Sequence, residues 1–81
     1  MDFAVTAPEQ LGQTLRGLRR ARGLSQDAVA HSTGLTQKTV SQLENRPQTC
    51  SVATLMKYLA ALGVAVALRE RGGRASNSES W

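Results

Sequence analysis

The stretch from Ser25 to Arg46, SQDAVAHSTGLTQKTVSQLENR, reads as two short helices joined by a tight turn. Ser25 and Thr36 carry side-chain oxygens that accept hydrogen bonds from free helix-start amides, so each is expected to be an N-cap. Gly34 is expected to end the first helix, because glycine enters the left-handed region without a Cβ penalty. This spacing predicts a helical hairpin, and the flanking segments must supply the rest of its core.

The second helix of this pair has one apolar and one polar face. Val40 and Leu43 form the apolar stripe, at positions i and i+3. The outward positions are polar: Gln37, Lys38, Ser41 and Gln42. Glutamine can pair with adenine in the major groove, lysine with guanine, and serine with several base edges. This pattern is typical of a helix-turn-helix motif, although a solvated polar face on an ordinary hairpin is an open alternative.

Two further helices are expected around the pair. The earlier one should begin near Pro8, which suits a first helical turn, and should end at Gly23. Its apolar stripe is Leu11, Leu15 and Leu18. The later one should be capped by Ser51 and end at Gly63, and its core stripe should be Val52, Leu55, Leu59 and Leu62, with Tyr58 alongside. The sequence thus predicts an all-α core of four to five short helices.

The pattern changes period after Gly63. Val64, Val66 and Leu68 alternate with smaller or polar residues, which is typical of a β-strand with one bulky face. A single strand leaves backbone donors and acceptors without partners. Either residues 3–5 or a second copy of the chain must supply the pairing strand, whereas a continued helix is disfavoured by the glycine.

Composition limits the classes of function that are expected for this chain. The chain has 81 residues, with ten basic and six acidic side chains, which suits one small domain and a polyanionic partner. Cys50 is the only cysteine, so no internal disulfide forms, and Cys50 with His31 is too little for a zinc site. No nucleophile–base pair, metal spacing or phosphate loop is visible, so neither an enzyme nor a cofactor is expected. No signal peptide or membrane span is visible either, which predicts a cytoplasmic, nucleoid-associated protein.

Three segments together carry a family resemblance: LRRARGLSQDAVA, GLTQKTVSQLENR and SVATLMKYLAALGV. Over residues 11 to 64 the chain resembles the phage-repressor and Cro family, also called Xre-type. The resemblance implies a lambda-repressor-like fold that binds double-stranded operator DNA. It also implies a structural ion pair between Arg19 and Glu44, in which a planar guanidinium can hold a carboxylate bidentately.

We expect the recognition helix to read bases through Gln37, Lys38 and Ser41. Contacts to the DNA backbone are expected from a wider set: Gln26, by its family counterpart, and Thr36, Gln42, Arg46, Arg20 and Arg22. A solvated basic face is the alternative for the arginines.

The strand and tail extend the resemblance to HipB-type antitoxins, which are dimeric repressors that bind HipA-type serine/threonine kinase toxins. We expect an arm over residues 1–7, a DNA-binding and dimerisation domain over 8–70, and a disordered tail over 71–81. The strand should pair across the homodimer, and Trp81 should contact the toxin, unless it is an incidental residue. A stand-alone phage-type repressor and a protein-interaction domain without DNA binding are the alternatives.

Overall fold

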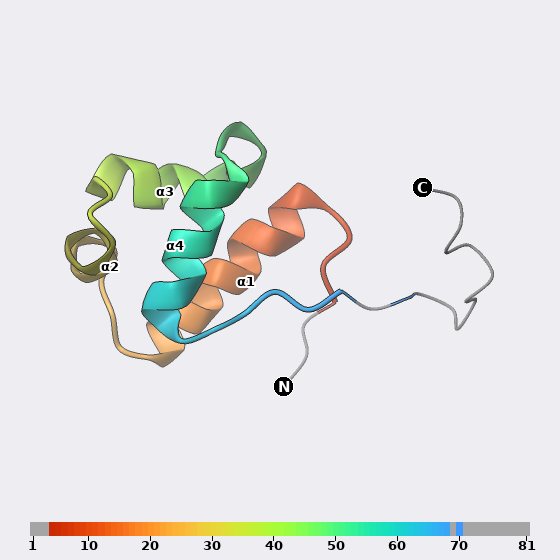
Figure 1. Ribbon diagram of the computed structural model, residues 1–81, viewed down its shortest axis with the longest axis horizontal. Coiled ribbons are helices and arrows are strands. Elements are labelled where there is room, and N and C mark those ends of the chain that lie inside the picture. The colour runs from red at the N-terminus through yellow and green to blue at the C-terminus, as the bar shows by residue number, and fades with distance from the viewer. Residues whose placement is uncertain (1–3, 69, 71–81) are drawn as a thin grey trace.

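Four α-helices and one short 3-10 helix make up the described part of the chain (Figure 1). The computed structural model describes residues 4–68 and 70. Its elements are α1 (Pro8–Ala21), α2 (Gln26–Thr33), α3 (Gln37–Asn45), the 3-10 helix η1 (Pro47–Thr49) and α4 (Val52–Leu62). No helix within these residues is long and apolar enough to cross a membrane. The all-α class expected from the sequence is therefore confirmed.

The helix boundaries follow from local chemistry. The Ser25, Thr36 and Ser51 hydroxyls accept hydrogen bonds from the amides of Ala28, Thr39 and Thr54 at 3.0–3.1 Å, as expected of N-caps. Gly34 and Gly63 end α2 and α4 in the left-handed conformation, with φ of 76° and 72°. The stop at Gly34 leaves only a short turn between α2 and α3.

The core lies where the four helices meet. Its most deeply buried side chains are Tyr58, Leu15, Leu43, Val29 and Val40. Helix α3 packs against both α1 and α2, and α2 also contacts α4. Because α3 is held from two sides, its orientation is fixed by the rest of the domain.

The expected apolar stripe of α4 is partly wrong. Val52 is 68% exposed, since it is the first residue of the helix and its side chain faces solvent. The buried face instead consists of Tyr58, Leu59 and Leu62, with Leu55 partly buried before them. Only Val52 departs from the expected stripe, and Tyr58 lies on the buried face beside Leu55, Leu59 and Leu62 as expected.

The strand expected after Gly63 is not present in the described residues. Residues 64–68 leave the helical body as a segment without regular secondary structure (Figure 1). Val64 packs against the core, but Val66 is 49% and Leu68 is 92% exposed. A strand needs a second strand to satisfy its backbone groups, and residues 4 and 5, the described part of the expected intramolecular partner, form none.

A glycine sets how closely α1 approaches the end of α3. A Cβ atom at Gly12 would lie inside contact distance of the Glu44 carbonyl oxygen and close to Pro47. Gly17, one and a half turns later in the same helix, has open space around it. Glycine at position 12 is therefore required by packing, whereas glycine at position 17 is not.

We predict that Gly12→Ala destabilises the domain by about 1–3 kcal/mol, because the added methyl group forces α1 away from α3. Gly17→Ala is the matched control and should stabilise by up to about 1 kcal/mol, since alanine favours the helix. Urea denaturation followed by circular dichroism measures both changes. Equal effects of the two substitutions would contradict the close approach at Gly12.

Candidate nucleic-acid interface

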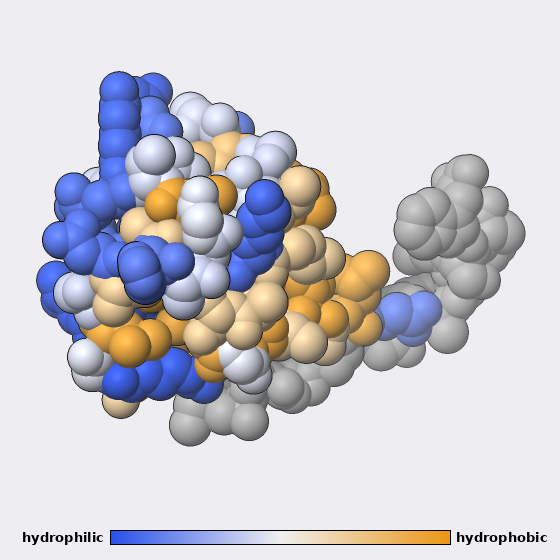
Figure 2. All heavy atoms as spheres, turned by 60° about the vertical axis from the view of Figure 1, so that its left-hand side comes forward, coloured by the Kyte–Doolittle hydropathy of each residue, from blue (hydrophilic) through white to orange (hydrophobic). Residues whose placement is uncertain are grey.

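Helix α3 presents the polar side chains that the sequence predicts for base reading. Gln37 and Lys38 are its first two residues and are exposed, whereas Ser41 is half-buried one turn later. Val40, Leu43 and Glu44 lie on the opposite, buried face. Figure 2 shows that hydrophilic side chains gather on the side of the molecule that carries α2 and α3 in Figure 1. One face of α3 is thus free to meet a partner.

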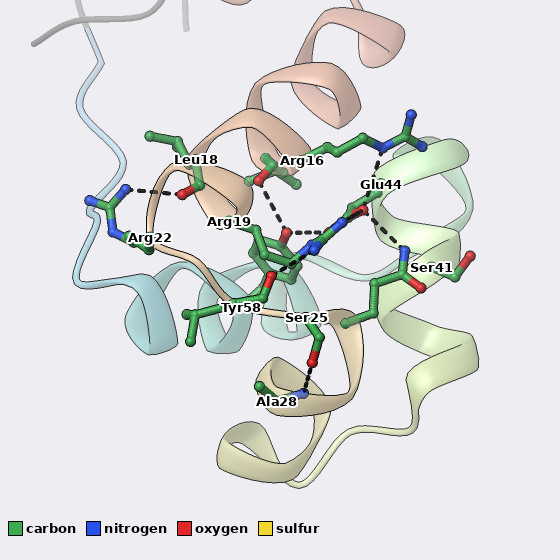
Figure 3. A network of polar contacts seen from close by, with 12 residues as sticks. Arg16, Leu18, Arg19, Arg22, Ser25, Ala28, Ser41, Glu44 and Tyr58 are labelled. Carbon is green, nitrogen blue, oxygen red and sulfur yellow. Dashed lines mark hydrogen bonds and ion pairs between the residues drawn. The ribbon is translucent and has the colours of Figure 1, made fainter.

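The buried face of α3 is anchored by an ion pair. Arg19 of α1 donates from Nε to Glu44 Oε2 at 2.6 Å and from Nη2 to Glu44 Oε1 at 3.1 Å. Its third nitrogen, Nη1, donates to the Leu24 carbonyl at 2.7 Å, in the loop before α2. Arg19 and Glu44 are only 7% and 4% exposed. The expected pair is present, and it ties α1, α3 and the entry to α2 together (Figure 3).

Tyr58 completes this cluster from α4. Its hydroxyl lies 2.5 Å from Glu44 Oε2 and 3.1 Å from the Leu15 carbonyl, so its single hydrogen can be donated to either oxygen. The three side chains Arg19, Glu44 and Tyr58 form what we call the buried polar cluster. No buried side-chain nitrogen or oxygen among the described residues lacks a hydrogen-bond partner.

The cluster shifts the pKa values of its members. Burial alone would raise the pKa of Glu44, but the hydrogen bonds from Arg19, Tyr58 and Gln26 outweigh it and lower that pKa. The hydrogen bond to Glu44 raises the pKa of Arg19, and burial together with the neighbouring carboxylate raises the pKa of Tyr58. At neutral pH the cluster therefore holds an ionised carboxylate, a charged guanidinium and a neutral phenol.

Hydrogen bonds connect this cluster with the exposed face of α3. Gln26, the first residue of α2, donates from Nε2 to Glu44 Oε1 at 3.1 Å. Gln37 in turn donates from Nε2 to Gln26 Oε1 at 2.9 Å. The carboxylate accepts only, so it fixes which end of the Gln26 amide points inward, and that amide then fixes Gln37.

Of the other residues expected to contact the DNA backbone, some are exposed and others make contacts within the domain. Gln42, Arg46 and Arg20 are exposed, and Thr36 uses its hydroxyl to cap α3. Arg22 donates to the carbonyls of Leu62 and Leu18 at 2.8 and 3.2 Å, where it closes the C-terminal end of α4. Figure 3 shows it on the far side of the buried polar cluster from α3. The structure thus does not bring Arg22 to the polar face. Trp81 lies outside the described residues.

Sequence patterns alone do not identify several residues of this site. Tyr58 reads as part of an apolar stripe, yet its hydroxyl reaches the ion pair. Arg16 donates to Asn45 Oδ1, and Asn45 donates to Ser41. A signal for Tyr58 exists, because a lone tyrosine in a leucine stripe needs a partner for its hydroxyl. The link from Arg16 to Asn45 spans 29 residues, and nothing local in the sequence indicates it.

Comparison with known proteins agrees with this geometry. Residues 10–72 match the model of a family described as a helix-turn-helix domain. The chain is 31% identical over 64 residues to antitoxin HipB of Escherichia coli O6:H1, a match that covers 79% of this chain and 68% of that protein. Antitoxin HipB of Escherichia coli K12 is 30% identical over 64 residues, covering 79% and 73%.

Solved structures give the same result. A HipA–HipB–O2–O3 complex contains a chain with a TM-score of 0.82 and 27% identity, covering 86% of this chain and 99% of that one. A HipB–O1–O2 complex gives a TM-score of 0.81 at 28% identity, covering 85% and 100%.

We predict that Arg19→Ala and Glu44→Ala each destabilise the domain by about 3–5 kcal/mol, since each leaves a buried charge without its partner. The double variant should lose much less than the sum of the two, because no charge is then stranded. Urea denaturation of the wild type, the two single variants and the double variant gives the free energies of unfolding for this double-mutant cycle. Additive losses would show that the two side chains do not stabilise each other.

Proposed function

The chain belongs to the helix-turn-helix family of HipB-type antitoxins, and from that premise we propose that it is a sequence-specific transcriptional repressor that also neutralises a toxin. The observation that carries the DNA-binding part is the polar face of α3, anchored from behind by the buried polar cluster. An excess of four positive charges favours a polyanionic partner. This is a binding function without a catalytic step.

In this proposal α3 enters the major groove with its first turn leading. Gln37, Lys38 and Ser41 read base edges, while the phosphates are held by Gln26, Thr36, Gln42, Arg46 and Arg20. Gln26 donates one N–H to Glu44 and keeps a second that is free to meet a phosphate oxygen. Arg22 is left out of this set because its guanidinium caps α4.

We further propose that the protein acts as a homodimer. One recognition helix reads few base pairs, whereas two copies about 34 Å apart would read successive major grooves of a palindrome. Residues 64–68 would supply the contact, as an antiparallel ribbon with their symmetry mates. The exposure of Val66 and Leu68 supports this, since their apolar surface is uncovered in the single chain. Figure 2 shows hydrophobic surface concentrated on the side where this segment leaves.

The antitoxin part of the proposal rests on the relatives. Proteins named antitoxin HipB match most of this chain, and a solved relative is described as a HipA–HipB–O2–O3 complex. We propose that the partner of this chain is a HipA-like serine/threonine kinase toxin. The same relatives make a stand-alone phage-type repressor the less favoured alternative.

We predict that Gln37→Ala or Lys38→Ala weakens binding to the cognate site by about 1–3 kcal/mol and relaxes the base preference at one position. The matched control for Lys38→Ala is Lys57→Ala, which also removes one positive charge but from an exposed position on α4. Fluorescence anisotropy with specific and scrambled duplexes at fixed salt separates a loss of affinity from a loss of base preference. An unchanged base preference in both α3 variants would remove their assignment as base readers.

We predict that Val66→Pro weakens the dimer, because proline removes a backbone donor from the proposed ribbon. Residue 67, one position later, would face the opposite direction along a strand. Ala67→Pro therefore tests which register is paired. Sedimentation equilibrium measures the assembly state. A dimer of unaltered strength in both variants would place the interface elsewhere.

The tail from Arg71 to Trp81 lies outside the described residues, and its role follows from the sequence. We predict that deleting Asn77 to Trp81 leaves DNA binding and dimerisation unchanged and weakens binding to the proposed HipA-like kinase toxin. Isothermal titration of that kinase with the full and shortened chains is the measurement. If both chains bind equally tightly, the helical domain alone carries the toxin-binding surface.

A further inference from the structure

A second hydrogen-bonded chain runs from the buried polar cluster to the exposed face of α3. It begins at Arg16 of α1, whose Nε lies 3.5 Å from Glu44 Oε1. Figure 3 shows this side chain extending from α1 toward α3. Arg16 Nη2 donates to Asn45 Oδ1 at the last residue of α3. Asn45 Nδ2 donates to the Ser41 carbonyl at 3.0 Å and to Ser41 Oγ at 3.2 Å.

The direction of each bond in this chain follows from chemistry. A guanidinium only donates hydrogen bonds, so the Asn45 atom that faces Arg16 must be its oxygen. The amide nitrogen of Asn45 is then the atom that faces Ser41. Ser41 Oγ therefore accepts from Asn45, and its own hydrogen is left to point elsewhere. No hydrogen bond from this hydroxyl to another described residue is present.

We propose that Arg16 and Asn45 are positioning residues that hold Ser41 as a hydrogen-bond donor toward the DNA bases. A serine hydroxyl can ordinarily turn to donate or to accept. One of its two lone pairs is engaged by Asn45 from behind, which orients the hydroxyl so that its hydrogen points outward and meets a base edge that carries acceptors. Guanine offers only acceptors in the major groove, N7 and O6, whereas cytosine offers the N4 donor. At the position that it contacts, Ser41 prefers guanine to cytosine. This inference rests on the proposed role of α3 in base reading.

Asn45→Asp tests the inference by reversing the last bond. The aspartate has the size of asparagine and still accepts from Arg16; its second oxygen loses the bond to the Ser41 carbonyl, turns away from that oxygen and accepts the Ser41 hydrogen. The hydroxyl then turns inward and presents only lone pairs to the DNA. The preference for guanine over cytosine should reverse at that position, changing the affinity ratio by about tenfold, the size of one hydrogen bond.

The measurement uses the full chain and duplexes randomised over about two helical turns, sequenced before and after selection at fixed salt. Ser41→Ala identifies the position that Ser41 reads, and adding Asn45→Asp to it should cause no reversal. Gln48→Glu adds the same charge at an exposed site of η1 and controls for repulsion by phosphates. Arg16→Gln breaks the chain without adding a negative charge and should move the ratio toward one.

The outcomes separate the inference from the function on which it rests. If wild-type protein enriches no sequence, the DNA-binding function fails. If Ser41→Ala alters no position while Gln37→Ala does, base reading stands but Ser41 takes no part, and the inference is overturned. Retention of the guanine preference in the folded Asn45→Asp variant also overturns it. A reversal that disappears in the double variant supports it.

Discussion

The buried ion pair of Arg19 and Glu44 is the constraint on which the rest of the domain depends. Two opposite charges in a core of leucine, valine and alanine are tolerated only when each is fully hydrogen-bonded. Glu44 meets this requirement with donors from α1, α2 and α4, and Arg19 meets it with Glu44 and the Leu24 carbonyl. These bonds therefore tie the four α-helices together in one relative arrangement.

This arrangement makes α3 a rigid presenting element. Its C-terminal end is held against α1 through the close approach at Gly12, and its buried face is held through Glu44. Its start is fixed by the Thr36 cap and by the bond between Gln37 and Gln26. In the proposed complex with DNA, a fixed helix would lose less conformational entropy on binding, so more of its contact energy would be available for discrimination between sequences.

Much of this fold can be predicted from local sequence signals, and the failures have physical reasons. Serine and threonine caps, glycine stops and leucine spacing all act within a few residues, which is why the helices and most of the core were predictable. Val52 fits the spacing of the core stripe, yet it is the first residue of its helix and its side chain is exposed. The strand over residues 64–68 requires a partner strand, and a single chain does not supply it. Links across 18 to 29 residues, such as Gln26 to Glu44 and Arg16 to Asn45, leave no periodic pattern.

The buried polar cluster also orients side chains at the surface. A well-packed set of apolar side chains often matches or exceeds the stability of a buried ion pair, so stability alone does not account for Arg19 and Glu44. Apolar side chains, however, make no directional hydrogen bonds that could orient side chains at the surface. The ionised carboxylate accepts hydrogen bonds only, and through Gln26 it determines that the nitrogen end of the exposed Gln37 amide points inward. The major-groove edge of an A·T pair presents an acceptor, a donor and an acceptor in turn. An amide that is free to flip can therefore pair with this edge in either of two orientations. In the proposed complex with DNA, fixing that amide from the core would let a short helix distinguish A·T from T·A.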